Sequence, residues 1–539
     1  MRPRIALALV WGAFLVRGSY YCVQQPIWEG LDEWAQFACL QHFAEHRHMP
    51  RRSDPVSDEV VRSLELVPLA YGTESWGANG LSHDAYWQLP AAERQRRHEE
   101  LERLTASYPR PVSLPPAARQ QYEAQQPPLY YALLVTPYLA IRNRPLPEQV
   151  LCLRLLSLTI ASLTILFGYA VAREVPAARR SAVLVAAMLA CMPALAMDLS
   201  RIGNHVLAIP LISAVLLCAL RALRRRRTRD WALLGTLLAA ALLAKGYALV
   251  MVPVVILAAA LAAARNRRAV AGGALALALA FAGAGWWYAN NLRTTGTIAG
   301  EQMDVAARAG AAEKLAAVGQ VQWVRVLDSA AMTHIWIGGW SFLLVRSWMY
   351  RVFELLAAAS VAGILMMAGR LVRDPRFSVV AGAWLLFCLA MAYFSLTTFL
   401  AMHFSAGVGW YLNAIVVAEA VLLACAGTGL AGVRRAGAYV ALAALLALAL
   451  DLYTVHFLLG PYYTGLIRHR PSGALETFHI GYLSRIGIQE YFRRLTPPWL
   501  WMAYLCANFG LAAVIVKSAR QSATSRSARN PTAAPARRW

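Results

Sequence analysis

The sequence predicts an all-α polytopic membrane protein with about 12 (11 to 13) transmembrane helices and a large extracytoplasmic first loop that contains interfacial helices. Of the 539 residues, 58% are hydrophobic and only 15% are charged. The hydrophobic residues form many uninterrupted runs of roughly 18 residues or more, long enough for a helix to cross a bilayer core of about 30 Å. A soluble chain of this length would instead show amphipathic periodicity over two or more domains.

The net charge of +23 lies in short basic turns between the hydrophobic runs. This distribution is typical of the positive-inside rule, and it does not form the continuous basic stripe of a nucleic-acid-binding protein. We therefore predict a cytoplasmic position for the following basic turns: 173–180, 221–229, 265–268, 370–376, 434–435 and the tail after Lys517.

The N-terminus has the flanks of a signal peptide, with basic residues in 1–4 before a hydrophobic run that extends to Cys22. No small-residue cleavage site follows this run, so we expect a retained membrane anchor. The eight cysteines lie mostly inside hydrophobic runs, which argues against a disulfide framework. A bridge between Cys22 and Cys39 is the pairing that this arrangement leaves open.

The number of spans must return the basic tail to the cytoplasm, and an even number starting from a cytoplasmic N-terminus does so. The expected spans are about 4–22, 151–172, 180–199, 203–221, 231–247, 248–264, 269–289, 351–369, 377–400, 405–429, 436–456 and 498–517. Three polar regions then face outward, namely 24–126, 290–350 and 457–497. Loops of this size can build a site at the membrane surface.

The hydrophobic segment 127–141 is short and begins with two prolines. A crossing there would invert every later loop, so we expect a re-entrant or surface helix on the outer side. The predicted domains are a membrane core with the first outer loop over 1–300, C-terminal membrane helices over 301–517, and a disordered basic cytoplasmic tail over 518–539.

An acidic cluster, which contains Asp32, follows the first span by a few residues. On a helix Glu29, Glu33 and Gln36 share one face, so a carboxylate can point back toward the membrane core. The alternative is a solvated helix start, where acidic residues favour the positive end of the helix dipole.

Cationic residues stand at membrane depth at three later positions, Arg154, Arg201 and Lys245. Placing an ionisable side chain inside a membrane span costs free energy, so such a residue usually has a polar partner or a function. Snorkelling to the lipid headgroups is the alternative for the two arginines. Lys245 stands out because hydrophobic residues surround it and because the chain has only two other lysines, Lys314 and Lys517.

Together these features resemble the C-type superfamily of polyprenyl-phosphate-dependent membrane glycosyltransferases, which includes the protein O-mannosyltransferases and the lipid A aminoarabinose transferase. The order and topology of the motifs carry the resemblance, which covers about residues 5–300. In chain order the motifs are 29–33, Met49-Pro50, 126–131, Arg154 with Leu155-Leu156, 201–204, Lys245, 285–288 and 291–296.

The resemblance implies an inverting glycosyltransferase that moves a sugar from an undecaprenyl- or dolichyl-phosphate carrier to a glycan, lipid or protein acceptor at the outer face. Polyprenyl phosphate is already a good leaving group, so the site needs a base for the acceptor and cations for the phosphate. The implied site residues are Asp32 and Glu33 for catalysis, Arg154, Arg201 and Lys245 for the donor phosphate, and Glu29, Gln126, Tyr130, Asn204 and Asn291 for substrate. No metal ligand is assigned, and a divalent metal stays open as a cofactor.

The chain departs from the superfamily pattern at three places. Gln36 stands where relatives often carry His, and His205 stands where many have Asp. Trp410 replaces the Arg of a late Gly-Arg-Tyr motif. The missing acidic residue bears on whether the site uses a metal. The missing cation bears on how tightly the site binds the donor.

Two other functional classes are also compatible with the sequence. One is a transporter or flippase for a lipid-linked solute, and the other is an inactive scaffold of an envelope-glycan assembly. A cavity that joins Asp32 to Lys245 would favour the enzyme, whereas acidic residues turned to bulk solvent would favour the scaffold. The sequence has no phosphate loop, CxxC pair or HExxH motif. His42, His46 and His48 are close enough to bind metal, but stray histidines on a surface helix explain them better.

The predicted location is the bacterial inner membrane, because Arg- and Ala-rich usage suggests a GC-rich genome. Both termini would face the cytoplasm, and the large loops and the active site would face the periplasm. No nucleic acid is expected as a partner.

Overall fold

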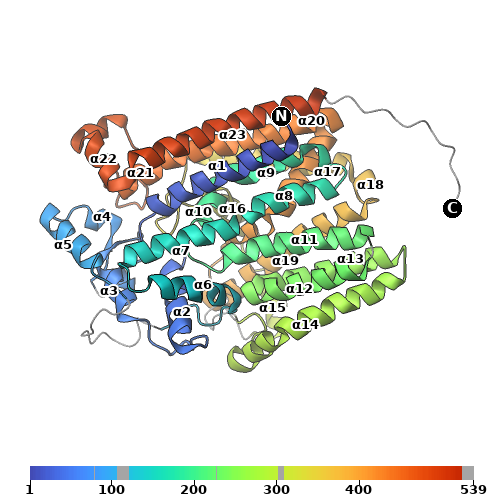
Figure 1. The fold of residues 1–539 in the computed structure, drawn as a ribbon, viewed down its shortest axis with the longest axis horizontal. Helices are drawn as coiled ribbons and strands as arrows, with labels where there is room; N and C mark the ends of the chain where they lie inside the picture. The colour runs from blue at the N-terminus through green and yellow to red at the C-terminus, as the bar shows by residue number, and fades with distance from the viewer. Residues whose placement is uncertain (78, 106–119, 226, 301–308, 525–539) are drawn as a thin grey trace.

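The computed structural model describes residues 1–77, 79–105, 120–225, 227–300 and 309–524. Long helices run side by side, and many of the shorter helices gather at one end of the molecule (Figure 1). Among the described residues, nine helical segments are long and apolar enough to cross a membrane, and shorter apolar helices accompany them. The expected class, an all-α polytopic membrane protein, is confirmed.

All of the expected spans fall mainly on helices. Their bounds are α1 Pro3–Gln24, α7 Leu146–Ala161, α8 Leu163–Glu174, α9 Ala182–Cys191, α10 Pro193–Asp198, α11 His205–Arg225, α12 Thr228–Ala244, α13 Met251–Ala263, α14 Arg268–Thr295, α17 Ser347–Met366, α19 Pro375–Met402, α20 Val416–Thr454 and α23 Pro498–Thr524.

Shorter elements connect these helices. They are α2 Glu33–His46, α3 Asp58–Leu66, η1 Glu74–Trp76, α4 His83–Tyr86, α5 Ala91–Leu101, α6 Leu129–Ile141, η3 Arg179–Ser181, η4 Gly246–Val250, α15 Ala311–Val318, α16 Trp323–Ile335, α18 Ala368–Leu371, η5 Gly409–Ile415, η6 Val455–Leu459, α21 Gly460–Tyr463, η7 Ile480–Arg485 and α22 Ile488–Leu495. Strands β1 Pro68–Leu69 and β2 Leu81–Ser82 pair in parallel in the first outer loop, with Pro68 opposite Leu81.

The sequence pattern explains where the long helices break. Gly432 has a left-handed backbone (φ 73°) inside α20, and it stands just before the basic pair 434–435 that marks the predicted turn between two spans. The helix α10 begins at Pro193, which separates it from α9 within one expected span. At Gly429 the backbone of α20 approaches that of α17 at Gly363, and a side chain at Gly429 would collide with it.

The short apolar segment forms the helix α6, Leu129–Ile141, which packs against α2, α7 and α12. Its 13 residues extend about 20 Å at 1.5 Å per residue, which is less than the roughly 30 Å of a bilayer core. The helix alone is thus shorter than the core, and the re-entrant or surface position expected for 127–141 stays a prediction.

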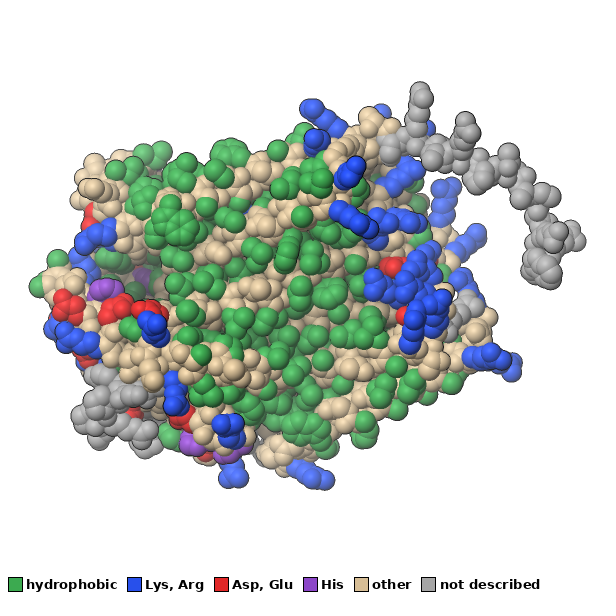
Figure 2. Space-filling model, viewed as in Figure 1, with side chains coloured by type: hydrophobic (Ala, Val, Ile, Leu, Met, Phe, Trp, Pro, Cys, Tyr) green, Lys and Arg blue, Asp and Glu red, His purple; other side chains and the backbone are tan. Residues whose placement is uncertain are grey.

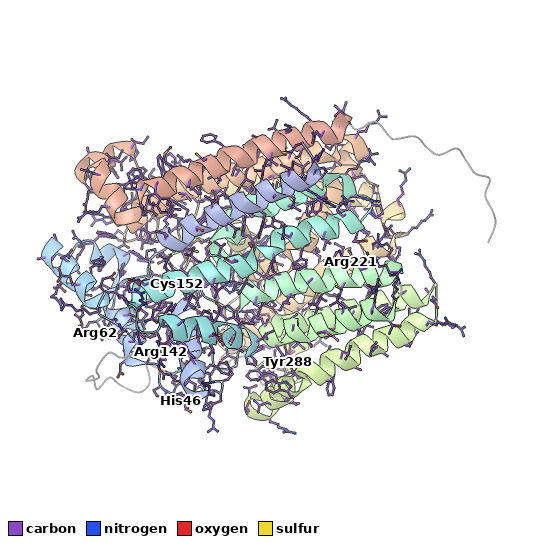
Figure 3. All side chains as sticks on the ribbon, in the orientation of Figure 1. His46, Arg62, Arg142, Cys152, Arg221 and Tyr288 are labelled. Atoms are coloured by element: carbon purple, nitrogen blue, oxygen red, sulfur yellow. The ribbon has the colours of Figure 1, made fainter. Side chains whose placement is uncertain are left out.

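Charged side chains gather at the two ends of the molecule. Lys and Arg are densest at the right-hand end in Figure 2, while the left-hand end shows acidic and His side chains together with further Lys and Arg. In Figure 3, Arg221 lies toward the first of these ends and His46 and Arg62 lie at the other. The positive-inside rule associates an excess of Lys and Arg with the cytoplasmic side, and the cytoplasmic assignment of the denser basic end remains a prediction.

Two details of the sequence analysis change. All eight cysteines, each within the described residues, are unpaired, so the Cys22 to Cys39 bridge is absent; the Cys39 thiol instead contacts Gln121 Oε1 at 3.6 Å. The helix α23 continues to Thr524, past the start of the tail predicted at 518. The rest of that tail, 525–539, lies outside the described residues.

One ion pair is buried between the helices. Arg17 of α1 lies 2.6 Å from Asp451 of α20, and both side chains are fully buried. Tyr21 and Tyr504 donate hydrogen bonds to the same carboxylate, at 2.8 and 2.5 Å. Arg17 also donates to the carbonyl of Ala190 in α9. This cluster joins the N-terminal helix to α9, α20 and α23 in an apolar environment, where such bonds have no water to replace them.

Candidate active site

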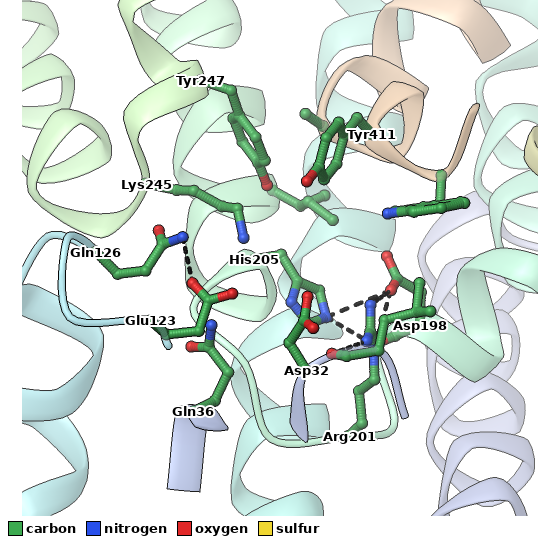
Figure 4. A pocket seen from close by; sticks show the side chains of 14 residues that line it. Asp32, Gln36, Glu123, Gln126, Asp198, Arg201, His205, Lys245, Tyr247 and Tyr411 are labelled. Atoms are coloured by element: carbon green, nitrogen blue, oxygen red, sulfur yellow. Dashed lines mark hydrogen bonds and ion pairs between the residues drawn. The ribbon is translucent and has the colours of Figure 1, made fainter. Parts of the chain in front are cut away.

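One pocket collects side chains from segments that are far apart in the sequence (Figure 4). Its free volume is about 490 Å³, including the part that is open to solvent. Four of the residues implied by the resemblance line it: Asp32, Gln126, Arg201 and Lys245. The other lining residues are Leu31, Gln36, Glu123, Asp198, His205, Ile209, Tyr247, Trp410, Tyr411 and Ala414.

Asp32 stands at the N-terminal cap of α2 with a left-handed backbone (φ 57°) and makes no capping hydrogen bond. Asp tolerates this conformation better than most residues, and such positions often occur at functional sites. Within the described part of the chain, the Asp32 carboxylate has no hydrogen-bond or ion-pair partner. Burial raises its pKa above the usual value, while Arg201 and Lys245 act in the opposite direction. The carboxylate is therefore free to accept a proton.

Arg201 is fixed by contacts on both sides of the pocket. Its guanidinium forms an ion pair with Asp198, the last residue of α10, and donates to the Leu31 carbonyl. Asn413 donates to the second oxygen of Asp198 at 3.0 Å. At Gly30 a Cβ atom would lie 2.8 Å from the Arg201 side chain, so glycine lets the first outer loop pass beside it.

Lys245 occupies the break between α12 and η4, where its extended backbone (φ −159°) interrupts the helix. Its ammonium group donates to Asn204 Oδ1 at 2.7 Å. Asn204 Nδ2 donates to Gln126 Oε1 at 2.7 Å, and Gln126 Nε2 donates to Glu123 Oε2 at 2.5 Å. A continuous chain of hydrogen bonds thus links the lysine to a carboxylate across the pocket wall.

Glu123 is buried beside this pocket, and its protonation depends on its surroundings. Burial and, second, the negative charge of Asp32 raise the pKa of Glu123 to about 7, although Lys245 acts in the opposite direction. The side chain is therefore neutral below about pH 7 and anionic above it. Its ionisation adds negative charge to a pocket that also contains Arg201 and Lys245.

This titration predicts a pH-dependent affinity for an anionic ligand. A polyprenyl-phosphate sugar is a phosphodiester, so its own charge does not change near neutrality. Its affinity is expected to fall about three- to tenfold from about pH 6 to about pH 8 as Glu123 ionises. The check is equilibrium binding across this range. In Glu123→Gln the decline should disappear; a decline that persists unchanged would assign it to another group.

Glu33 and Arg154 lie outside the lining of this pocket. Arg154 Nε donates to Glu33 Oε1 at 2.8 Å, and its Nη2 donates to Glu33 Oε2 at 2.5 Å. The remaining guanidinium N–H groups donate to the carbonyls of Cys22, Gln25 and Pro26. All five donors of Arg154 therefore have acceptors, and the pair anchors the first outer loop to α7.

Besides Asn204, three other residues implied by the resemblance also lie outside the lining of this pocket. Glu29 contacts His83 Nε2 at 3.1 Å and accepts the Ser341 backbone N–H at 3.1 Å. The Tyr130 hydroxyl accepts the backbone N–H of Gly203 at 3.0 Å, beside Arg201. Asn291 is buried on α14. The first two hold loops that border the site.

Sequence reasoning did not assign several residues of the pocket. Asp198 lies three positions before Arg201, a spacing that typically forms an ion pair, so this signal was present. Glu123 lies three positions before Gln126, and only the fold shows that both face Asp32 (Figure 4). His205 packs its Nε2 against the Asp198 carbonyl at 2.8 Å. No signal in the sequence connects Tyr247 with Tyr411.

The part of the chain that the structure describes has no group of three His, Cys, Asp or Glu side chains arranged to hold a metal ion. The rings of His42, His46 and His48 do cluster, with centroids 4.4 to 5.9 Å apart, at the end of α2. The pocket itself contains a free carboxylate, two fixed cations and aromatic rings. This combination can bind an anionic group and remove a proton beside it.

Fold and pocket define a polytopic membrane protein with a charged site. Asp32 and Gln126 of this site come from the 24–126 loop, and Arg201 and Lys245 come from breaks between helices. Residues 127–287 match the family model described as dolichyl-phosphate-mannose-protein mannosyltransferase. Over this segment the match confirms the resemblance to the C-type superfamily of membrane glycosyltransferases. No curated protein sequence matches the chain significantly.

The solved structures that are similar to this one include those of two membrane proteins. The structure of ArnT from Cupriavidus metallidurans bound to undecaprenyl phosphate is 13% identical, with a TM-score of 0.45, and the match covers 97% of this chain and 77% of that one. The structure of the oligosaccharyltransferase AglB from Archaeoglobus fulgidus, with an inhibitory peptide and a dolichol-phosphate, is 14% identical, with a TM-score of 0.39. That match covers 96% of this chain and 56% of AglB.

Proposed function

We propose that this protein transfers a sugar from a polyprenyl-phosphate carrier to an acceptor at the outer face of the inner membrane. The pocket that joins the unpaired Asp32 carboxylate to Arg201 and Lys245 carries this proposal. The family match at 127–287 supports it, because that segment contributes Arg201 and Lys245. A membrane-embedded location suits a donor whose lipid tail stays in the bilayer.

In this proposal the donor phosphate lies against Arg201 and Lys245. The acceptor hydroxyl or amine attacks the anomeric carbon while Asp32 takes its proton. The bond from the anomeric carbon to the phosphate oxygen breaks, and polyprenyl phosphate leaves with the electron pair. A single displacement of this kind inverts the anomeric configuration. The cations stabilise the charge that develops on the departing phosphate, so no general acid is required.

The remaining residues have supporting roles in this proposal. Glu33 and Arg154 hold Asp32 in place through the first outer loop, and Tyr130 holds the turn that bears Arg201. Asn204 orients Lys245. Glu29 fixes the loop at Ser341, and Asn291 remains a candidate substrate contact on α14. Both termini face the cytoplasm, and the loops face the periplasm.

The geometry favours the enzyme over the two other classes. An inactive scaffold would leave its acidic residues turned to bulk solvent, but Asp32 faces a pocket with two cations and Glu33 is fully buried. A flippase needs a path between the two membrane faces. The pocket instead lies among the outer loops and the helix ends next to them.

The proposed contact between Lys245 and the donor phosphate predicts the effect of removing this lysine. Lys245→Ala should weaken binding of a polyprenyl-phosphate sugar about 10- to 100-fold, because a hydrogen bond to a charged group typically contributes roughly 1.5–3 kcal/mol. Lys314→Ala is the matched control, since Lys314 is a partly exposed lysine of α15 that donates to Tyr393. Equal donor affinity in the two variants, measured in lipid nanodiscs, would refute the phosphate-binding role.

A further inference from the structure

Aromatic side chains from four separate segments form a row of neighbouring rings that ends at the pocket. The ring centroids of Trp34 in α2 and Trp76 in η1 are 6.0 Å apart, and those of Trp76 and Trp340 are 6.1 Å apart. Trp340 is 6.4 Å from Trp410 in η5, which is 5.9 Å from Tyr411. We call these five residues the aromatic track.

The inner end of the aromatic track is part of the candidate active site. Trp410 and Tyr411 line the pocket, and Tyr411 lies 6.3 Å from Tyr247, which also lines it. Lys245 Nζ lies 5.5 Å from the centre of the Tyr247 ring. A second pocket beside the first shares Arg201 and Trp410 with it. The track therefore leads from the outer loops to the proposed reacting groups.

The rings of the track are available to a ligand. All five side chains are partly exposed. Neighbouring rings meet at tilted or edge-on angles, between 53° and 85°, so they do not cover one another as stacked rings would.

Specific contacts hold the central ring in place. The backbone before Trp340 is left-handed at Gly338 (φ 68°) and Gly339 (φ 75°), which turns the loop sharply. After it, the Ser341 N–H donates to the buried Glu29 carboxylate at 3.1 Å. A partly exposed indole on a loop that is fixed at both sides is pre-organised for a ligand, because little conformational entropy is lost on binding.

The chemistry of the surroundings selects the ligand. An acyl chain would cover the rings but would leave the Asp32 carboxylate of the adjoining pocket facing it without a polar partner, which is costly. A sugar ring has an apolar C–H face that packs on an indole and hydroxyl groups at its edge that bond to such residues. We propose that the aromatic track binds successive sugar rings of an oligosaccharide, so that the acceptor is a glycan chain. This inference rests on the proposed function, because it names the acceptor of that reaction.

The test is binding of short glycans to the full chain in lipid nanodiscs, with no donor present. The probes are four hexaoses, of α-linked glucose, β-linked glucose, N-acetylglucosamine and mannose. We expect saturable binding of at least one, with saturation-transfer NMR showing contact at the ring C–H protons. Trp340→Ala and Trp76→Ala should each weaken it about tenfold, since each removes one ring contact.

Trp348→Ala and Trp499→Ala are the matched controls, because these indoles are 60% and 69% exposed but belong to α17 and α23. They should bind the glycan as the native chain does, and all four variants should melt at the native temperature. The inference is overturned if no hexaose binds, if a control weakens binding as much as Trp340→Ala, or if only lipid or peptide probes bind. Because this binding assay contains no donor, its result does not depend on sugar transfer. A failure of the transfer reaction would appear in the separate assay that contains the donor.

Discussion

Asp32→Asn is expected to lower the turnover number of sugar transfer about 10²- to 10⁴-fold, the usual contribution of a positioned general base. Asparagine keeps the size of the side chain but cannot accept the acceptor's proton. The Asp32 carboxylate makes no structural hydrogen bond or ion pair within the described part of the chain, so the fold should be retained. The apparent donor affinity should change little, because Arg201 and Lys245 remain in place.

The measurement is steady-state transfer with separate determination of kcat and KM for the donor. Asp54→Asn is the matched control: it lies in the same outer loop, where its carboxylate accepts the Arg51 N–H at 2.7 Å. That variant should keep the native kcat. A native kcat in Asp32→Asn would exclude Asp32 as the base, whereas a rise in KM alone would give it only a binding role.

Asp451→Ala is expected to lower the free energy of unfolding by about 3–5 kcal/mol, because it leaves the Arg17 guanidinium buried without its counter-ion. The two tyrosine hydroxyls that donate to Asp451 would also lose their acceptor. Reversible unfolding in detergent micelles measures this loss. Asp328→Ala is the control, since Asp328 is exposed on α16 and its replacement should cost at most about 0.5 kcal/mol.

A double-mutant comparison separates the ion pair from simple loss of packing. Replacing Arg17 and Asp451 together with Met and Leu removes both charges and restores apolar volume. This double variant should be more stable than Asp451→Ala alone, because no uncompensated charge remains. If the double variant loses, relative to the native chain, the full sum of the losses of the two single variants, Arg17 and Asp451 do not act as a pair.

The sequence predicted the helices well because membrane crossing is a local property of composition and length. The spans 405–429 and 436–456 illustrate this, since the basic pair between them marks a turn and the structure breaks the helix at Gly432. The segment 127–141 likewise forms a helix of 13 residues, in keeping with the short hydrophobic run in the sequence. Each of these features depends on residues that are adjacent in the chain.

The site was less predictable, because it depends on which distant side chains meet. Arg154 and Arg201 look alike in sequence, each a single cation near the outer end of a span. Only the fold shows that Arg154 is committed to Glu33 whereas Arg201 lines the pocket. Likewise, Trp76 and Trp340 are 264 positions apart, yet their rings are 6.1 Å apart. Periodicity and spacing contain no information about such contacts.

The most direct test of the central claim is sugar release from a panel of polyprenyl-phosphate sugars by the purified chain in lipid. The native chain should turn over at least one donor, Asp32→Asn and Lys245→Ala should lose that turnover, and Lys314→Ala should retain it. No release from any donor by the native chain, or undiminished release by Asp32→Asn, would contradict the assignment of this pocket as a glycosyl-transfer site.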